Sequence, residues 1–346
     1  MATRVLRIIP GRLSLVTAAL AFLCVGPVPA SGQNRPIVIK MASLAPASSQ
    51  WHDALMEMRE QWLEVSDGKV DLRIISGGQG GEEEDVLRKM RIGQFQAGGF
   101  TIAGLQSLST AVAALAIPLL METQDDLHRV RAAVGPDLEE LFLEQGYVLL
   151  HWVDMGWMQF FTPEPDASPD AIRSYTYMEW GENAMTSVWR DAGFSPGARL
   201  NIADVTLGLQ TGLVEAINTA PLVVFGYQWF TQLPYMIDVH WAPLSGAVLV
   251  DRRTWEKIPE NLRPELKRIA LETGERIQIS LLQWEAEAIE AMESHGLQVI
   301  HPSPEVMNEW RRLFRGSLDL LRGDIIPPAL FDKAMKAANN GGAGHP

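Results

Sequence analysis

Cysteine is almost absent from this sequence: Cys24 is the only one among 346 residues. A single cysteine excludes an intramolecular disulfide, so stability has to come from burial of a hydrophobic core. The bulky Leu23 directly before Cys24 also argues against lipid attachment at that position. The mature chain has no HExxH motif, no paired cysteines and no histidine-rich spacing. We therefore predict neither a metal site nor a cofactor.

Signs of catalysis are weak as well, and no cysteine nucleophile lies in the mature chain. The glycine-rich turn at 77–81 is of the kind that holds phosphates, but residues 82–85 are all acidic and would repel one. We interpret it as a tight turn with Gln79 facing a cleft. A non-enzymatic function is expected, and an exported hydrolase acting through a pair of carboxylates is the alternative.

Positive charge is scarce: 29 basic residues stand against 42 acidic ones, a formal net charge of −13. A chain this acidic repels the phosphates of nucleic acids and anionic lipid surfaces. Beyond the amino terminus there is no run of about 18 consecutive apolar residues. The mature protein is therefore expected to be soluble and to bind no nucleic acid.

The first 30 residues have the three regions of a secretory signal peptide. Three arginines precede an apolar run at 13–25, and small residues follow at 28–31. The run is shorter than the roughly 20 residues that a membrane-spanning helix needs. We predict that residues 1–30 are a signal peptide, cleaved after Ala30 or Gly32, and that the protein is periplasmic.

The mature chain begins with alternating apolar runs and amphipathic segments. Residues 37–41 and 70–75 have the pattern of strands, and an apolar spacing near 3.6 after Ser49 predicts a helix. This order favours an α/β fold with a parallel sheet. A much longer amphipathic segment, Asn261–His295, predicts a helix of about 50 Å, long enough to contact two lobes. Three prolines at 163–169 mark a boundary between lobes.

Aromatic residues are the most informative part of the composition. The sequence has 11 tryptophans, and several lie at predicted strand ends beside polar residues. Any single tryptophan is more often part of a core than of a site. Together, however, aromatic side chains with a few fixed polar groups are what a small-molecule cleft needs.

Four segments form a pattern that no single motif provides. They are Lys40–Ser43, Ser66–Val70, Gly78–Gly81 with the acidic helix after it, and Leu209–Ala216. With these segments nearly the whole mature chain resembles the solute receptors of tripartite ATP-independent periplasmic (TRAP) transporters, the DctP-like family, whose LQTGVVDG segment is similar to the last of them. The resemblance implies a two-lobed type II periplasmic binding protein fold with a long helix spanning both lobes. It also implies capture of a small molecule and its delivery to membrane permease subunits.

We expect the two lobes each to consist of two chain segments. Lobe I comprises residues 34–158 and 245–285, lobe II comprises 159–244 and 286–335, and 336–346 form a disordered tail. Because contacts from both lobes are made together only in a closed form, ligand binding is expected to stabilise closure by a hinge motion.

The sequence departs from the family at residues that bind the ligand. Receptors for organic acids carry an arginine in a K-x-R strand of the second lobe, where its guanidinium holds the carboxylate of the ligand. Here Tyr177 stands where that arginine would be, and Arg173 is four residues out of register. The family's asparagine after the LQTG segment falls near Thr219, with Asn218 beside it. Because tyrosine cannot neutralise a carboxylate, we expect a neutral or largely apolar ligand.

The same departure resembles divergent receptors that occur with a tetratricopeptide-repeat lipoprotein, which is therefore a second expected partner besides the permease. An organic acid bound without the usual arginine, and a scaffold that has lost ligand binding, are the other interpretations. The candidate ligand-binding residues are Trp51, Gln79, Thr101, Asp154, Trp157, Tyr177, Glu179, Trp180, Thr219, Gln228 and Trp229.

Overall fold

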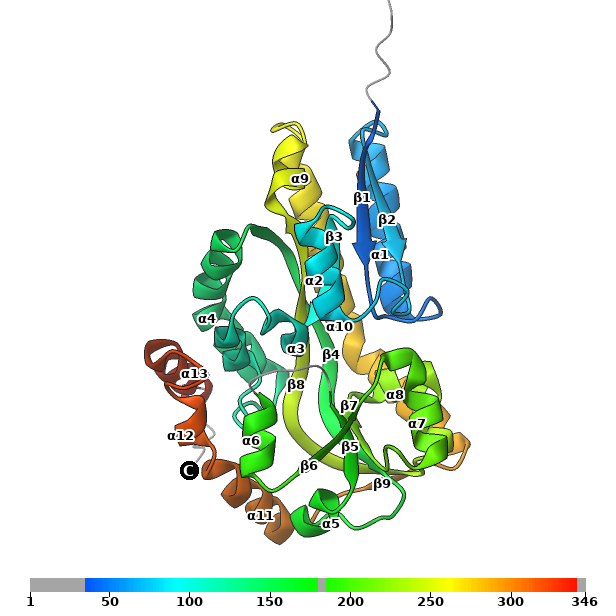
Figure 1. Cartoon of the computed structure of the whole chain (residues 1–346), viewed down its shortest axis with the longest axis vertical. Helices are drawn as coiled ribbons and strands as arrows, with labels where there is room; N and C mark the ends of the chain where they lie inside the picture. The colour runs from blue at the N-terminus through cyan, green and yellow to red at the C-terminus, as the bar shows by residue number, and fades with distance from the viewer. Residues whose placement is uncertain (1–34, 180–184, 341–346) are drawn as a thin grey trace, which may run out of the picture. The chain divides into compact units, whose positions relative to one another are not determined.

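The computed structural model describes residues 35–179 and 185–340, and Figure 1 shows their arrangement. The predicted signal peptide, the candidate Trp180 and the last six residues of the predicted tail lie outside this part of the chain. Among the described helices, none is both long enough and apolar enough to cross a membrane.

The amino-terminal part alternates strands and helices in the predicted order. Its elements are β1 (Ile37–Ala42), α1 (Gln50–Val65), β2 (Val70–Ile75), α2 (Glu83–Arg91) and β3 (Ala97–Thr101). β1 pairs in parallel with both β2 and β3. α1 begins after Ser49, whose hydroxyl accepts a hydrogen bond from the His52 amide and so satisfies one of the free donors of the first turn. The predicted parallel α/β beginning is confirmed.

Two long antiparallel strands, β4 (Tyr147–Thr162) and β8 (Tyr235–Asp251), form the centre of the sheet. In the described residues this sheet has seven strands in the order β2-β1-β3-β8-β4-β7, with β9 beside β8. The register of β4 shifts between Asp154 and Trp157, where Gly156 has a φ of 88° that suits glycine. β4 and β8 curve along their length and contribute to both halves of the molecule (Figure 1). β7 covers Ile217–Thr219 and β9 covers Gln298–Ile300.

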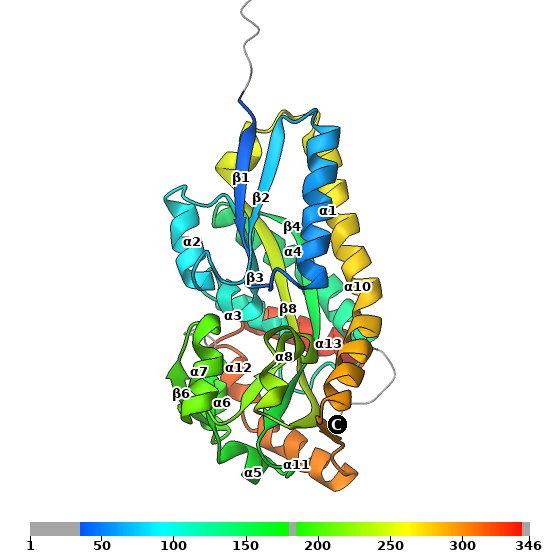
Figure 2. The ribbon, with the colours of Figure 1, turned by 90° about the vertical axis from the view of Figure 1, so that its right-hand side faces the viewer.

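The longest helix is α10 (Arg263–Ser294), which confirms the predicted long helix to within two residues at the start and one at the end. It lies beside α1 (Figure 2), and the Trp62 indole of α1 donates a 3.1 Å hydrogen bond to the Leu266 carbonyl oxygen. Its buried side chains enter three apolar cores, with Leu266 in one, Ile277 in the next and Met292 in the third. The helix therefore packs against both lobes.

The two faces of the sheet in the first lobe have separate cores. Val248 and Val250 of β8 belong to the core covered by α1 and α10, whereas Ala247 and Leu249 belong to the core covered by α2 and α4. This division follows from the strand itself, because successive side chains point to opposite faces. The sheet is thus buried on both sides, which is typical of α/β proteins.

An aromatic core fills the second lobe. β5 (Thr176–Glu179) and β6 (Ser195–Arg199) form a small parallel sheet there. Phe160 of β4 is fully buried, with ring centroids 5.1 Å from Trp310 and 6.1 Å from Tyr177. Other rings that contact Phe160 belong to Trp189, Phe194 and Trp241. Large aromatic side chains bury much apolar area each, so this cluster is a main source of stability for the lobe.

The remaining helical elements connect and cover these sheets. They are α3 (Ile102–Leu105), η1 (Thr110–Leu115), α4 (Gln124–Glu144), α5 (Pro169–Arg173), α6 (Met185–Asp191), η2 (Ile202–Asp204), α7 (Val205–Thr211), α8 (Pro221–Tyr227), η3 (Trp229–Thr231), α9 (Arg252–Lys257), α11 (Pro304–Arg315), α12 (Leu318–Leu321) and α13 (Pro328–Asn339).

The carboxyl-terminal helix α13 differs from two expectations, its lobe and the start of the tail. Its residues Phe331 and Ala334 share a core with Val134 and Leu138 of α4, so it packs against the first lobe although the predicted boundary assigns 286–335 to the second. It also continues to Asn339, so residues 336–339 are helical where a disordered tail is predicted. The apolar spacing of the helix buries one face against α4, and that packing holds the last turns in place.

Candidate ligand-binding cavity

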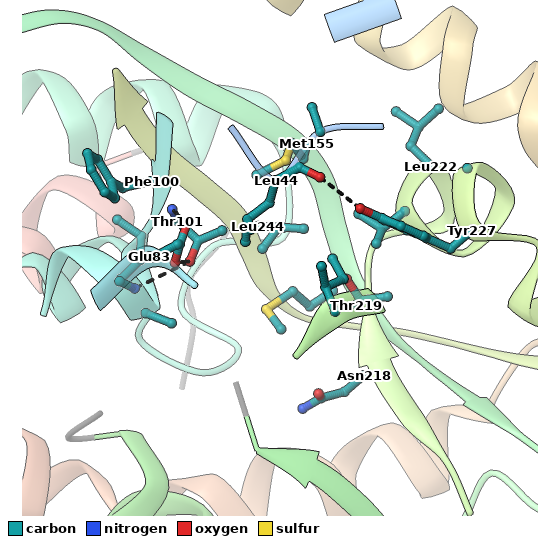
Figure 3. Close-up of a pocket in the computed structure, with 18 of the residues that line it drawn as sticks. Leu44, Glu83, Phe100, Thr101, Met155, Asn218, Thr219, Leu222, Tyr227 and Leu244 are labelled. Carbon is teal, nitrogen blue, oxygen red and sulfur yellow. Dashed lines mark hydrogen bonds between the residues drawn. The ribbon is translucent and has the colours of Figure 1, made fainter. Parts of the chain in front are cut away.

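A cavity of about 1130 Å³ lies between the two lobes. The first lobe lines it with the loop after β1, the start of α2 and the end of β3, and the second lobe lines it with β5, β7 and α8. β4 and β8 contribute from the middle of their length. Figure 3 shows Glu83 and Thr101 on one side, with Thr219 and Tyr227 on the other. The volume is slightly above the range that is typical of small-molecule sites, roughly 300–1,000 Å³.

On the first-lobe side, Glu83 of α2 is bonded to the end of β3. The Thr101 amide and hydroxyl donate hydrogen bonds of 2.5 and 2.7 Å to its two carboxylate oxygens. Burial raises the pKa of Glu83 to about 7, against the lowering effect of the Thr101 hydrogen bonds. Near neutral pH this carboxyl group is therefore partly protonated, and it ties α2 to the strand whose end lines the cavity.

His151 of β4 also lines the cavity and is 2% exposed. Its Nδ1 lies 2.9 Å from the Trp152 carbonyl oxygen, which can only accept, so Nδ1 carries the proton. Burial lowers the pKa of His151 to about 4, and the nearby Lys267 acts in the same direction. The imidazole is therefore neutral at pH 7 and has its acceptor at Nε2.

On the second-lobe side, Tyr177 is 5% exposed and is packed into the aromatic core. Its hydroxyl donates a 2.8 Å hydrogen bond to the Ile172 carbonyl oxygen, so the hydroxyl already has a partner within the protein, and the residue lines the cavity. Arg173 does not line the cavity. It donates to the Pro169 and Ala192 carbonyl oxygens and pairs with Asp170 instead.

Side chains from the two lobes form two walls of the cavity. The first-lobe wall consists of Trp51, Glu83, Thr101 and His151. The second-lobe wall consists of Tyr177, Trp189, Phe194 and Trp241. In the second-lobe wall the ring centroids of Trp189 and Trp241 lie 4.7 Å apart, edge to face.

The charged groups around the cavity are mostly acidic. Among the described residues that line it, Arg199 is the single arginine or lysine, and Glu82, Glu84 and Asp204 join Glu83 as acidic groups. The Arg199 guanidinium lies 2.9 Å from a Glu84 carboxylate oxygen. Burial raises the pKa of Glu82 as well. A negatively charged ligand would therefore meet like charge in the cavity, and the one arginine of the described lining, Arg199, is already paired with Glu84.

At least three contacts between described residues join the lobes at the cavity. The Tyr227 hydroxyl donates a 2.8 Å hydrogen bond to the Leu44 carbonyl oxygen (Figure 3), and the Ile202 amide donates one of 3.1 Å to Glu82. The third is the Arg199 to Glu84 ion pair. Burial, and then the charge of Glu82, raise the pKa of Tyr227 to about 12, so its hydroxyl keeps its proton and donates throughout the neutral range.

Residues 41–320 match the family model of the bacterial extracellular solute-binding proteins of family 7, DctP. The chain belongs to this family of TRAP solute receptors. The solute-binding protein RD1_1052 of Roseobacter denitrificans is 22% identical over 286 residues, which cover 81% of this receptor and 86% of that protein. The C4-dicarboxylate-binding periplasmic protein DctP of Rhodobacter capsulatus is 22% identical, over 84% and 86% of the two chains.

Solved structures share the fold of the receptor. A TRAP periplasmic solute-binding protein from Shewanella oneidensis with bound succinate has a TM-score of 0.82 at 14% identity, covering 88% of this chain and 99% of that one. The sugar acid binding protein DctPAm from Advenella mimigardefordensis in complex with galactonate also has a TM-score of 0.82, at 15% identity, covering 88% and 98%. The receptor therefore has the two-lobed periplasmic binding protein fold, and these relatives are binding proteins rather than enzymes.

Five of the predicted ligand-binding residues line the cavity of the receptor. They are Trp51, Thr101, Tyr177, Thr219 and Gln228. Thr219 and the neighbouring Asn218 lie in β7, next to β4, and Gln228 ends α8 with a left-handed φ of 59°. Glu179 is the last residue of β5. The five come from both lobes and surround one cavity.

Four predicted residues lie outside the cavity lining. Gln79 is exposed on the glycine turn, outside the cavity lining. Asp154 is buried and accepts hydrogen bonds from Arg131, Ser245 and Gln278, which leave its carboxylate no oxygen for a ligand. 

The two remaining predictions are tryptophans that serve the core. Trp157 is 5% exposed and stacks on His240 with ring centroids 5.6 Å apart. Trp229 is fully buried, and its indole donates a 3.2 Å hydrogen bond to the Thr206 hydroxyl. Both tryptophans therefore pack in apolar cores and lie outside the cavity lining.

Several lining residues escape the sequence reasoning, among them His151, Trp241 and Tyr227. His151 is three residues from Asp154, and the alternation of β4 was the available signal, since His151, Val153 and Met155 line the cavity together. Trp241 lies in β8, a strand that the sequence reasoning does not identify.

One sequence motif of hydrolases is also missed. Gly193–Gly197 matches the pattern G-x-S-x-G, in which a serine nucleophile sits on a turn from a strand into a helix. Here the order is reversed, because α6 precedes the motif and Ser195 begins β6, paired with Thr176. The match therefore does not form a nucleophile elbow.

Proposed function

We propose that this receptor works in the periplasm, where it captures a small neutral or largely apolar molecule and delivers it to a TRAP-type secondary transporter. Tyr177 carries the proposal. Its buried ring lines the cavity where related receptors for organic acids are expected to carry an arginine, and its hydroxyl is already bonded to the Ile172 carbonyl. The predicted signal peptide supports the periplasmic location.

The charges around the cavity support a ligand without a carboxylate. An anion buried without a cationic partner costs several kcal/mol. Arg199 is paired with Glu84, and Glu82 and Asp204 add negative charge to the lining. The second-lobe wall offers aromatic surface instead, and burial of apolar area stabilises a complex by about 25 cal/mol per Å².

An organic acid is the second candidate ligand, because the solved relatives from Shewanella oneidensis and Advenella mimigardefordensis contain succinate and galactonate. In that case Arg199 would have to leave Glu84 and pair with the ligand. The ion pair is half-exposed, so the exchange requires little energy.

Delivery requires a membrane partner, and TRAP permease subunits are the partner that the family works with. We extend the proposal to a tetratricopeptide-repeat lipoprotein as a further partner. Its support is the replacement of the usual arginine by Tyr177, which resembles the receptors that occur with such a lipoprotein.

Native mass spectrometry of the receptor, purified without unfolding, tests the ligand class directly. We expect a bound small molecule without a carboxylate. After removal of that molecule by unfolding and refolding, calorimetry with succinate, galactonate and sialic acid should show no tight binding.

Two variants separate the candidates. Tight binding of succinate or sialic acid that is lost in Tyr177→Ala would overturn the proposal of a neutral ligand. If that binding is lost in Arg199→Gln and kept in the control Arg173→Gln, the organic-acid candidate replaces it, because Arg173 does not line the cavity.

A further inference from the structure

Two lining residues of the first-lobe wall carry buried nitrogens without a partner. The Trp51 Nε1 and the His151 Nε2 have no hydrogen-bond partner among the described residues, although each side chain is more than nine-tenths buried. Buried polar atoms in folded proteins are nearly always paired with protein, water or ligand. Both residues line the cavity, so these unpartnered nitrogens belong to side chains that border the space a ligand would fill. Trp241 of the second-lobe wall carries a third such nitrogen, its Nε1.

The two nitrogens have opposite roles. An indole Nε1 can only donate a hydrogen bond. The imidazole of His151 donates from Nδ1 to the Trp152 carbonyl oxygen at 2.9 Å, so its Nε2, at the tip of the ring, can only accept. The first-lobe wall therefore presents one fixed donor and one fixed acceptor.

α10 places the two side chains on one side of the cavity. His151 lies against Gly274, where an added Cβ would be 2.8 Å from its Nδ1 and 3.0 Å from its Cβ, so only glycine lets α10 approach the ring this closely. One turn further along α10, Ile277 shares a core with Trp51, and Val153 of β4 packs against the same core. His151 and Val153 are two residues apart on β4 and both line the cavity.

We propose that Trp51 and His151 recognise a neutral polar head group that both accepts and donates a hydrogen bond, a hydroxyl or a primary amide, while the rest of the ligand is apolar. The inference rests on the proposed function, which assigns the cavity to a neutral ligand. A carboxylate has no proton for the His151 acceptor, and its oxygens would face that lone pair. A hydroxyl group accepts from Trp51 and donates to His151, so both orphan atoms are satisfied.

Four probes with the same alkyl chain test the head group: 1-octanol, octanamide, methyl octyl ether and octanoate. Binding is measured by calorimetry on the ligand-free receptor at pH 7.5. We expect 1-octanol and octanamide to bind about tenfold more tightly than methyl octyl ether, which accepts but cannot donate. Octanoate should bind more weakly than the ether.

Substitutions assign the effect to the acceptor. His151→Phe keeps an aromatic ring of similar size without Nε2, and should bring the affinities for 1-octanol and methyl octyl ether within about twofold of each other. His151→Gln retains an acceptor and should keep part of the preference, which a purely structural role of His151 would not do. His301→Phe, an exposed histidine outside the cavity lining, is the control and should keep the full preference.

The outcomes separate this inference from the proposed function. If 1-octanol and methyl octyl ether bind the wild type equally, or if His151→Phe keeps the tenfold preference, the head-group inference fails while a neutral ligand stands. If octanoate binds tightly and the three neutral probes do not bind, the proposed function fails, and the inference fails with it.

Discussion

The two walls of the cavity differ in the hydrogen-bonding groups that lack a partner within the protein. In the second-lobe wall, Tyr177 has its hydroxyl bonded to the Ile172 carbonyl, and its ring contacts Phe160 and other rings. In the first-lobe wall, the Trp51 and His151 nitrogens lack partners, whereas Glu83 is bonded to Thr101. The second-lobe wall also contains an unpartnered nitrogen, the Trp241 Nε1, which can only donate a hydrogen bond. Of the three unpartnered nitrogens in the two walls, the one that accepts, His151 Nε2, belongs to the first-lobe wall. Variants in the two walls should therefore fail in different ways.

The largest effect is expected from the aromatic core behind the second-lobe wall. Phe160→Ala should lower the free energy of unfolding by about 3–5 kcal/mol, because it leaves a cavity among five contacting rings. Urea unfolding followed by circular dichroism measures the change. Leu143→Ala, at a side chain that is 45% exposed, is the control and should stay within about 0.5 kcal/mol. Similar losses in both variants would contradict the special role of the aromatic core.

The first-lobe wall should show its effect through pH. The folded pKa of His151 is about 4, below its ordinary value of 6.5, so the stability that the neutral ring contributes is present above pH 6.5 and is lost as the pH falls toward 4. Between pH 7 and pH 4 the wild type should therefore lose about 3 kcal/mol relative to His151→Phe. Urea unfolding of both proteins across this range measures the difference. A pH-independent difference would show that His151 is not buried in its neutral form.

Comparison with the variant is needed because Glu83 acts in the opposite direction. Its folded pKa is about 7, above the ordinary 4.5, so its contribution to stability is complete below pH 4.5 and is lost as the pH rises through 7. In the wild type alone the two contributions partly cancel. The difference between wild type and His151→Phe removes Glu83 from the measurement.

A smaller effect is expected when only the Tyr177 hydroxyl is removed. Tyr177→Phe keeps the ring and leaves the Ile172 carbonyl without its donor, so the free energy of unfolding should fall by about 1 kcal/mol. Ligand affinity should change less than about twofold, because the hydroxyl is already bonded within the protein. Calorimetry with the co-purified molecule checks the affinity. A loss of binding in Tyr177→Phe would show that the second-lobe wall also acts through a polar group.

The smallest effect on stability is expected at the ion pair between the lobes. Arg199 and Glu84 are both about half-exposed, so Arg199→Gln should lower the free energy of unfolding by less than about 1 kcal/mol. Thermal unfolding at low and at high salt measures it, and the small difference from wild type should shrink further at high salt. A loss of several kcal/mol would mean that this contact, and not the aromatic core, holds the second lobe in place.

Sequence reasoning predicts the helices of the first lobe well, because their patterns are local. The cap at Ser49 and the spacing of Trp51, Leu55 and Met58 predict α1, and the same period predicts α10. β8 is not predicted, because its 17 residues follow no clean alternation of apolar and polar side chains. The strand is buried on both faces for most of its length. Its place in the sheet depends on pairing with β3 and β4, which are distant in sequence.

The site residues show the same contrast between local patterns, which the sequence reveals, and contacts that only the fold reveals. Tyr177 and Thr219 are found because an aligned family motif places them, and Trp51 because it begins an amphipathic helix. Asp154 is chosen in place of His151 because only the folded β4 shows which of the two faces the cavity and which meets Arg131. Trp229 and Trp157 are chosen although they lie outside the cavity lining, because a core tryptophan and a cavity-lining tryptophan look alike in sequence.

The long helix α10 has a consequence for how the receptor unfolds. Leu266, Ile277 and Met292 belong to three different cores, so opening any one of them removes partners from the others. A two-domain protein joined by flexible linkers melts in separate steps. Here we expect a single cooperative transition, with amide hydrogens of α10 among the slowest to exchange with solvent.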